Sequence, residues 1–125
     1  MQTSQFELAI AAVSTGFTYS NALLVGGQPL LALEIVNGAG AAMADCKIQA
    51  QDNDNGEWYD YLTSTDFTAG VGSNLLFISA RPDTLAAGAK AHVHVRSNGT
   101  RSFRFAAKLA SGTGTVTVRG SKTDL

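Results

Sequence analysis

Residues 89–109 read AKAHVHVRSNGTRSFRFAAKL, and this stretch decides the fold class. Apolar and polar residues alternate on both sides of a Ser-Asn-Gly turn signal at 97–99, a pattern typical of two half-buried β-strands. A two-residue turn at 98–99 would place apolar and charged side chains on the same face. A three-residue loop instead sets Val93 opposite Phe103 and collects the apolar side chains on one face. We therefore predict a three-residue β-hairpin at this position.

The predicted register assigns a side to each residue that follows the turn. Gly99 closes the loop at positive φ, where a Cβ is penalised. His92 lies opposite Arg104 on the outer face. The residues predicted to face the core are Phe103, Phe105, Ala107, Leu109, Val116 and Val118.

The same alternation recurs along the rest of the 125 residues, in short windows separated by Gly, Asn and Asp clusters. It predicts strands at 6–12, 30–36, 44–51, 57–62, 75–79, 89–96, 102–109 and 115–119. No segment has the periodicity of a long amphipathic helix, and 83–87 is expected to form at most one turn. We predict an all-β fold, a single antiparallel β-sandwich domain over residues 1–125, with the first residues a candidate extended arm.

An aromatic strand follows a turn that is rich in Asp and Asn. The turn, residues 52–56, is DNDNG, and the strand after it begins WYDYL. Either Trp58 and Leu62 face the core or Tyr59 and Tyr61 do, and the other set is large, exposed and available to a partner.

Charge is divided unevenly along the chain. Residues 1–66 carry a net charge of −7 and residues 67–125 carry +6, within a total of −1. Two arrangements are open: the halves interleave in one sheet, so that their charges meet across strands, or they form a bipolar molecule that assembles head to tail. The total charge gives no electrostatic case for nucleic acid or an anionic membrane as a partner.

The chain offers no recognisable catalytic, cofactor or metal constellation. His92 and His94 share a strand face but lack a third ligand, so we expect a surface pair beside Arg104 and Ser102. Residues 52–63 lack the Gly and Glu positions of a calcium loop. A basic group on neighbouring strands lacks an outward stacking platform for nucleic acid; its members are Arg96, Arg101, Arg104, Lys108, Arg119 and Lys122, with both histidines. We predict a protein that is not an enzyme, with no cofactor and no metal.

The lone cysteine and the first residues bear on where the chain is made. Cys46 has no partner within the chain, which favours a reduced place of synthesis. The start lacks a basic and apolar leader, and no apolar run reaches membrane-spanning length. We expect synthesis in a reducing cytoplasm without a signal peptide, and no membrane partner.

Two stretches resemble immunoglobulin-like β-sandwich modules. Residues 31–40, LALEIVNGAG, resemble a strand, an Asn-Gly corner and the next strand. Residues 85–95, LAAGAKAHVHV, resemble the Leu-x-x-Gly turn that feeds an alternating strand. The resemblance implies an immunoglobulin-like sandwich and no particular activity.

A narrower resemblance is to small virion proteins of tailed bacteriophages. It rests on residues 49–60, QAQDNDNGEWYD, on RSFRF at 101–105, and on GTGTVTV at 112–118. It implies a virion structural protein, with capsid decoration (cement) first and a tail or head-tail component next. The implied partners are the major capsid protein or other virion subunits, and the implied assembly is a homo-oligomer, with a trimer favoured.

These expectations lead to one candidate interaction surface and one alternative function. The surface consists of Trp58, Tyr59, Tyr61, Arg96, Arg101 and Arg104. The alternative is a carbohydrate-binding β-sandwich module, suggested by the aromatic side chains beside the turn at 52–56.

Overall fold

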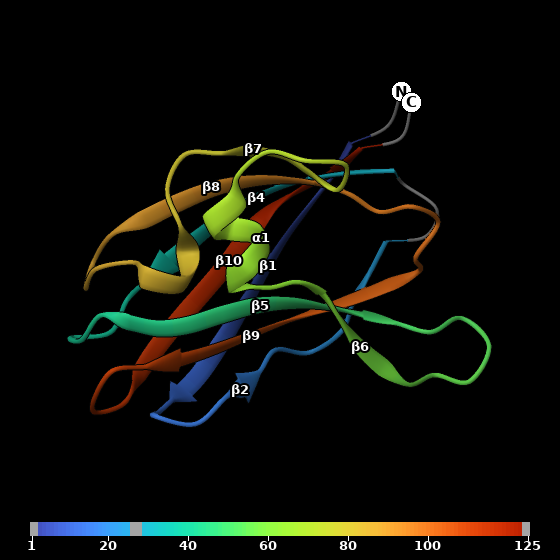
Figure 1. Ribbon diagram of the computed structural model, residues 1–125. Helices are drawn as coiled ribbons and strands as arrows, with labels where there is room; N and C mark the ends of the chain where they lie inside the picture. Colours follow the sequence, from blue (N-terminus) through green and yellow to red (C-terminus); the bar gives the residue numbers. More distant parts are fainter. Residues whose placement is uncertain (1–2, 26–28, 124–125) are drawn as a thin grey trace.

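Two antiparallel sheets pack face to face around one apolar core in the computed structural model, which describes residues 3–25 and 29–123 (Figure 1). The first sheet has the strand order β1 (Thr3–Val13), β10 (Gly114–Thr123), β4 (Leu30–Asn37), β8 (Lys90–Arg96) and β7 (Leu75–Ile78). The second has the order β2 (Thr18–Tyr19), β9 (Ser102–Leu109), β5 (Met43–Gln51) and β6 (Trp58–Leu62), and β3 (Leu23–Leu24) also pairs with β9. The predicted antiparallel β-sandwich is confirmed. Its immunoglobulin-like character stays a prediction.

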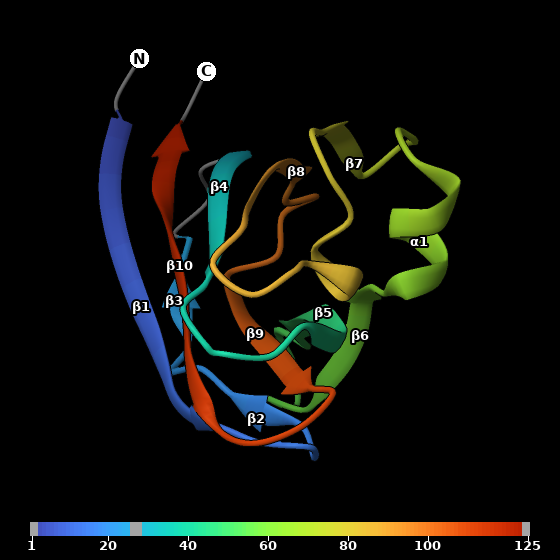
Figure 2. The same cartoon turned by 90° about the vertical axis from the view of Figure 1, so that its left-hand side faces the viewer.

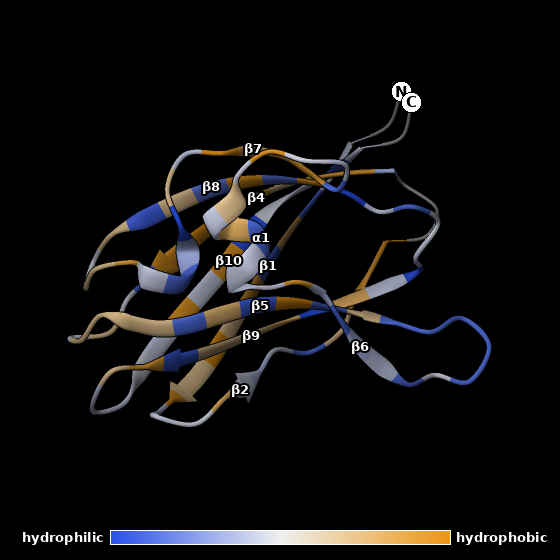
Figure 3. Cartoon of the chain, in the orientation of Figure 1, coloured by the Kyte–Doolittle hydropathy of each residue, from blue (hydrophilic) through white to orange (hydrophobic). Residues whose placement is uncertain are grey.

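Alternation along the strands builds the core, as the sequence indicated. Buried and exposed residues alternate strictly along β8, because successive side chains of a strand point to opposite faces. Figure 3 shows hydrophobic residues along the strands and a hydrophilic loop between β5 and β6. The predicted inward residues of β9 and β10 are all buried: Phe103, Phe105, Ala107, Leu109, Val116 and Val118. The strand predicted at 115–119 is longer than expected and reaches Thr123.

The predicted hairpin between β8 and β9 is wrong. β8 pairs with β4 and β7 in the first sheet, whereas β9 pairs with β5 in the second, so Val93 is not opposite Phe103. The register of β8 instead sets Val93 against Leu33 of β4. β8 and β9 present their apolar faces to the core from opposite sheets. A link between two sheets therefore buries the same alternating residues as the predicted hairpin would.

The link itself is a tight turn. The Thr100 N–H donates to the Ser97 carbonyl at 3.0 Å, and Asn98 and Gly99 both have positive φ, 52° and 75°. The positive φ of Gly99 is confirmed. Two consecutive positive φ values correspond to a two-residue turn, not to the predicted three-residue loop closed by a single left-handed residue.

A buried asparagine holds the corner between β4 and β5. Asn37 ends β4, and its side-chain nitrogen donates to the carbonyls of Ala41 at 2.9 Å and Leu85 at 3.1 Å. Gly88, at a φ of 76°, donates its N–H to the Asn37 carbonyl at 2.8 Å. The corner predicted at 31–40 and the turn predicted at 85–88 are therefore packed against each other.

The prediction missed three short elements: β2, β3 and the helix α1 (Ser64–Ala69). The single turn expected at 83–87 is a 3-10 helix, η1 (Pro82–Thr84), which begins one residue earlier. The Thr63 N–H donates to the Asp66 carboxylate at 2.8 Å at the start of α1. This Thr-x-x-Asp spacing is the capping pattern that could have revealed the helix in the sequence.

The N-terminal segment is a strand of the sheet from Thr3 onward, which corrects the expectation of an extended arm for these residues. β1 pairs with β10 from Thr3 opposite Thr123 to Val13 opposite Gly114. The arm as predicted from Met1 and Gln2 lies outside the described residues.

The acidic and basic halves of the chain interleave. In the first sheet, β10 and β8 of the basic half alternate with β1 and β4 of the acidic half. Glu34 on β4 accepts a hydrogen bond from Arg119 on β10 at 2.6 Å and lies 3.1 Å from His92 on β8. The premise of the bipolar arrangement is therefore not met in this sheet, because opposite charges meet within one copy.

Candidate interaction surface

The outer face of the second sheet carries a group of aromatic rings and cations. We call it the cation–aromatic face, and its members are Phe17, Tyr19, Lys47, Gln49, Trp58, Asp60, Arg104 and Lys108. The strands bring these residues together because β9 and β5 are adjacent and lie between β2 and β6. Alternate residues of each strand point away from the core.

Arg104 is the centre of this face. Its guanidinium carbon lies 4.1 Å from the ring centroid of Tyr19 and 4.6 Å from that of Trp58. Its Nε donates to the Gln49 carboxamide oxygen at 2.7 Å. No carboxylate of the described residues pairs with Arg104. The geometry holds the guanidinium in one place and leaves its terminal nitrogens without an anionic partner within residues 3–25 and 29–123.

A polar chain extends from Arg104 to the edge of the sheet. The Gln49 amide donates to the Asp60 carboxylate at 2.9 Å, and Lys47 Nζ lies 3.1 Å from the same oxygen. The hydrogen bond from Gln49, together with Lys47, holds the pKa of Asp60 below its usual range. Lys47 and Asp60 therefore compensate each other, which leaves Arg104 without a carboxylate partner among the described residues.

Phe17 is packed between the two lysines. Lys47 Nζ lies 4.5 Å from its ring centroid and Lys108 Nζ 4.9 Å. A cation over an aromatic ring is attracted by the negative face of the ring. The sequence analysis missed Phe17 and Tyr19, although their i, i+2 spacing is the same alternation used elsewhere to find strands.

The structure divides the predicted surface into two places. Trp58 and Arg104 meet on the cation–aromatic face. Tyr61 lies at the end of the sandwich, where its hydroxyl donates to the Arg96 carbonyl at 2.6 Å. Burial raises the pKa of Tyr61. Its ring packs edge to face on Phe103, with centroids 5.1 Å apart.

The remaining residues of the predicted surface lie away from Trp58 and Arg104. The Arg96 Nε donates to the Ser73 carbonyl at 3.3 Å. The Arg101 N–H contacts the Asn53 side chain at 3.4 Å. Tyr59 is 47% exposed and makes no ring contact with the described aromatic residues. Among the six predicted residues, the contacts join Trp58 with Arg104 and Tyr61 with Arg96.

A bulge explains why neither alternative for the aromatic strand holds by itself. The register between β5 and β6 shifts between Ile48 and Gln49, so that Leu62 pairs with Ile48 and Tyr59 with Ala50. A bulge reverses the alternation locally. Leu62 is buried, Tyr61 is half-buried beside it, and Trp58 is half-buried on the outer face.

The histidine pair lies elsewhere than predicted. His92 and His94 both point outward from the first sheet, but their neighbours are Glu34 and Phe77, not Arg104 and Ser102. Within residues 3–25 and 29–123, no three His, Cys, Asp or Glu side chains are placed to hold a metal ion.

The turn at 52–56 has the geometry expected of a turn. The Asp52 carboxylate accepts the N–H groups of Asp54 at 2.8 Å and Asn55 at 3.2 Å. The groups that donate to the Asp52 carboxylate are therefore main-chain N–H groups of the turn itself.

The basic group proposed from the sequence is split between the two sheets. Arg96, Arg119 and Lys122 lie on strands of the first sheet, whereas Arg104 and Lys108 lie on β9 of the second. The prediction of a group on neighbouring strands is wrong, because β8 and β9 are not neighbours.

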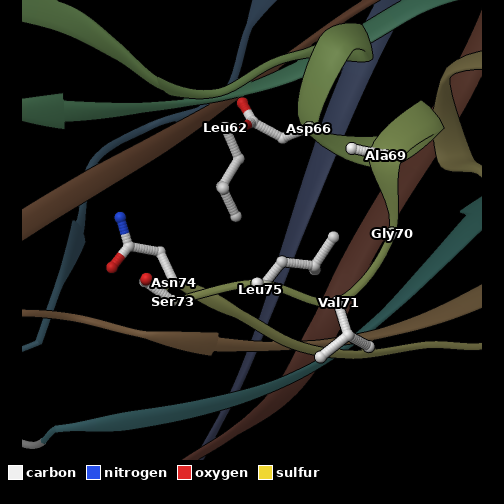
Figure 4. A pocket seen from close by; sticks show the side chains of 9 residues that line it. Leu62, Asp66, Ala69, Gly70, Val71, Ser73, Asn74 and Leu75 are labelled. Carbon is white, nitrogen blue, oxygen red and sulfur yellow. The ribbon is translucent and has the colours of Figure 1, made fainter.

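A hollow beside α1 is lined by Leu62, Asp66, Val71, Asn74 and Leu75, among others (Figure 4). Asp66 is the only charged side chain in this lining, and its carboxylate is already bonded to the N–H of Thr63.

The chain is an antiparallel β-sandwich whose second sheet carries the cation–aromatic face on its outer side. Its fold is similar to that of the SPBc2 prophage-derived protein YomS, with a TM-score of 0.55 and 17% identity over 98% of this chain and 96% of that chain. The sequence matches no protein-family model, and none of the curated proteins matches it. None of the described helices is long and apolar enough to cross a membrane.

Proposed function

We propose that this chain is a non-enzymatic structural protein of a phage virion that binds another virion subunit through the cation–aromatic face. The observation that carries the proposal is the fixed, carboxylate-free Arg104 between Tyr19 and Trp58. The similarity in fold to a protein titled prophage-derived supports the phage context. Capsid decoration is the first assignment, with the major capsid protein as partner, and a tail or head-tail component is the second.

The partner surface follows from the chemistry of this face. Rings cover Arg104, and its Nε is bonded to Gln49, so its terminal nitrogens are the groups that an incoming ligand can reach edge-on. A carboxylate matches this planar, bidentate geometry. Aromatic side chains around an arginine are also typical of the centres of protein interfaces. The partner therefore presents Asp or Glu side chains beside apolar surface.

The first experiment asks whether the chain is part of a particle. Particles are purified on a density gradient from the strain that encodes this sequence, and their proteins are measured by mass spectrometry. The proposal requires the chain at a fixed ratio to the major capsid protein, and its absence from intact particles contradicts the proposal.

The second experiment tests the face. Particles lacking the chain are incubated with purified wild-type protein, with Arg104→Glu, and with the control Lys90→Glu, which changes the same charge on the outer face of the first sheet. Loss of binding for Arg104→Glu alone supports the proposal. Equal binding by all three proteins contradicts the assigned face.

A carbohydrate-binding module is the alternative, favoured by the rings of Trp58 and Tyr19 on one flat face. Sugar rings stack on aromatic side chains. The Arg104 guanidinium already covers one side of the Tyr19 ring and one side of the Trp58 ring. Binding on a glycan array that is lost in Trp58→Ala, with no binding to particles, would favour this alternative.

A further inference from the structure

The strand β1 leaves one long edge of the first sheet open. It spans eleven residues, and among the described strands only β10 pairs with it (Figure 2). The opposite edge of the same sheet is β7, which has four residues. An unpaired strand edge presents a row of main-chain N–H and C=O groups that can pair with another strand.

β1 carries few of the features that protect sheet edges. Natural edges are blocked by Pro, by Lys, by inward-pointing charges or by bulges. β1 contains no Pro and no Lys, and its single charge, Glu7, points away from the core. Its irregularity, a positive φ of 54° at Ala12, lies at the end of the strand. Pairing with β10 is regular from Thr3 to Ile10, so residues 3–10 form a regular, uninterrupted edge.

The inner face of this edge is incompletely covered. Phe6 and Leu8 pack against the core but are only partly buried, whereas Ile10 is fully buried. A further strand beside β1 would cover the exposed parts of these two side chains. Apolar burial then adds to main-chain hydrogen bonding.

We propose that β1 pairs antiparallel with β1 of a second copy about a two-fold axis, with Leu8 opposite Leu8. This inference rests on the edge strand alone and is independent of the proposed function. The two five-stranded sheets then join into one continuous sheet. A two-fold contact between identical strands is the commonest form of closed self-association.

The register follows from the side chains. Residues that lie opposite each other in an antiparallel pair point to the same face of the sheet. One residue of β1 must therefore lie opposite the same residue of the second copy, and the two-fold axis passes between these two residues. An axis at Glu7 would place two carboxylates directly opposite each other, which is destabilising. An axis at Phe6 would set Leu8 against the polar Ser4.

An axis at Leu8 avoids both problems. It pairs Phe6 with Ile10 of the second copy on the inner face. On the outer face it pairs Glu7 with Ala9. On the inner face apolar residues meet apolar residues, and no two charges are opposed.

The first test uses sedimentation velocity over a series of protein concentrations. We expect concentration-dependent dimers. Ala9→Lys places a cation opposite Glu7 of the second copy, twice by symmetry, and should tighten association by about fivefold, whereas Ala9→Glu should weaken it by a similar factor. Ala87→Lys and Ala87→Glu introduce the same charges at an exposed loop position and should change nothing. A monomer at every concentration, for wild type and Ala9→Lys alike, would overturn the proposal.

The second test fixes the register by cross-linking. Under mild oxidation, Glu7→Cys mixed with Ala9→Cys should give a disulfide-linked pair, because these positions are opposite each other. Glu7→Cys alone should give little product, since diagonal positions are about 7–8 Å apart. The native Cys46 is buried and takes no part. Efficient cross-linking of Glu7→Cys alone would overturn the Leu8 register.

Discussion

The side-chain nitrogen of Asn37 donates a hydrogen bond to the main-chain carbonyl of Leu85 at 3.1 Å, and this bond ties the corner after β4 to the turn before β8. Asn37 is fully buried, and its side-chain oxygen also accepts the N–H of Ala39 at 3.1 Å. One side chain therefore bonds main-chain groups on both sides of the corner, and the Leu85 carbonyl also accepts the Met43 N–H at 2.9 Å.

Replacing Asn37 should be costly. Asn37→Ala removes the partners of the Ala39 N–H and the Ala41 carbonyl, and we expect a loss of about 3 kcal/mol in the free energy of unfolding. Urea denaturation measures this change. Asn21→Ala, at an exposed position, is the matched control and should lie within about 0.5 kcal/mol of wild type. A small effect of Asn37→Ala would show that water replaces the carboxamide.

Gly120 should not tolerate any side chain. A Cβ there would lie 1.8 Å from the Ala32 carbonyl oxygen, because β10 passes close to β4 at this point. Main-chain atoms at this distance must move, so we expect Gly120→Ala to cost at least about 4 kcal/mol or to prevent folding. Circular dichroism and thermal melting measure the effect. Gly40→Ala, where a Cβ meets nothing within 4 Å, should fold normally.

Glu34 should make stability depend on pH. The hydrogen bond from Arg119 is the main cause that lowers the pKa of Glu34, and the hydrogen bond from His92 lowers it further. Partial desolvation of Glu34 raises its pKa but does not outweigh these contributions. A lowered folded pKa gives stability that is present above the unfolded pKa, about 4.3, and is lost as the pH falls through the folded pKa. We expect Glu34→Gln to lose less stability than wild type between pH 5 and about pH 3. Parallel pH slopes for the two proteins in urea titrations would contradict this role.

The single tryptophan should report on Arg104. Trp58 is half-buried beneath the Arg104 guanidinium, so Arg104→Ala removes part of its cover. We expect the emission maximum of Trp58 to move to longer wavelength in the folded protein. Lys90→Ala, on the other sheet, should leave the emission unchanged. An unshifted spectrum in Arg104→Ala would mean that the guanidinium does not shield the ring in solution.

Cys46 should be inert in the folded protein. Its side chain is 2% exposed, and burial raises the pKa of the thiol to about 12. The thiolate is the reactive form, so a disulfide reagent at pH 8 should label the unfolded chain in urea and leave the native chain unmodified. Rapid labelling of native protein would indicate local opening of β5.

The cation–aromatic face shows how far sequence reasoning could reach. Arg104 was predicted from the sequence to point outward, because it occupies an outward position of an alternating strand, whereas the side that Trp58 faces was left open between two alternatives. Their proximity was not predictable, since it depends on β5 lying between β6 and β9. Tyr19 comes from a two-residue strand that is too short to give a periodic signal.

The sequence by itself determined the approximate positions of the eight longer strands, which side chains of β8 and β9 face the core, and the positive φ of Gly99. These features follow from alternation and from the steric freedom of glycine, which act between residues close in the chain. Only the tertiary structure decided that β8 pairs with β4 and not with β9. The physical reason is that strand pairing is chosen by apolar surfaces distant in sequence, and a hairpin and a link between two sheets bury the same alternating residues equally well.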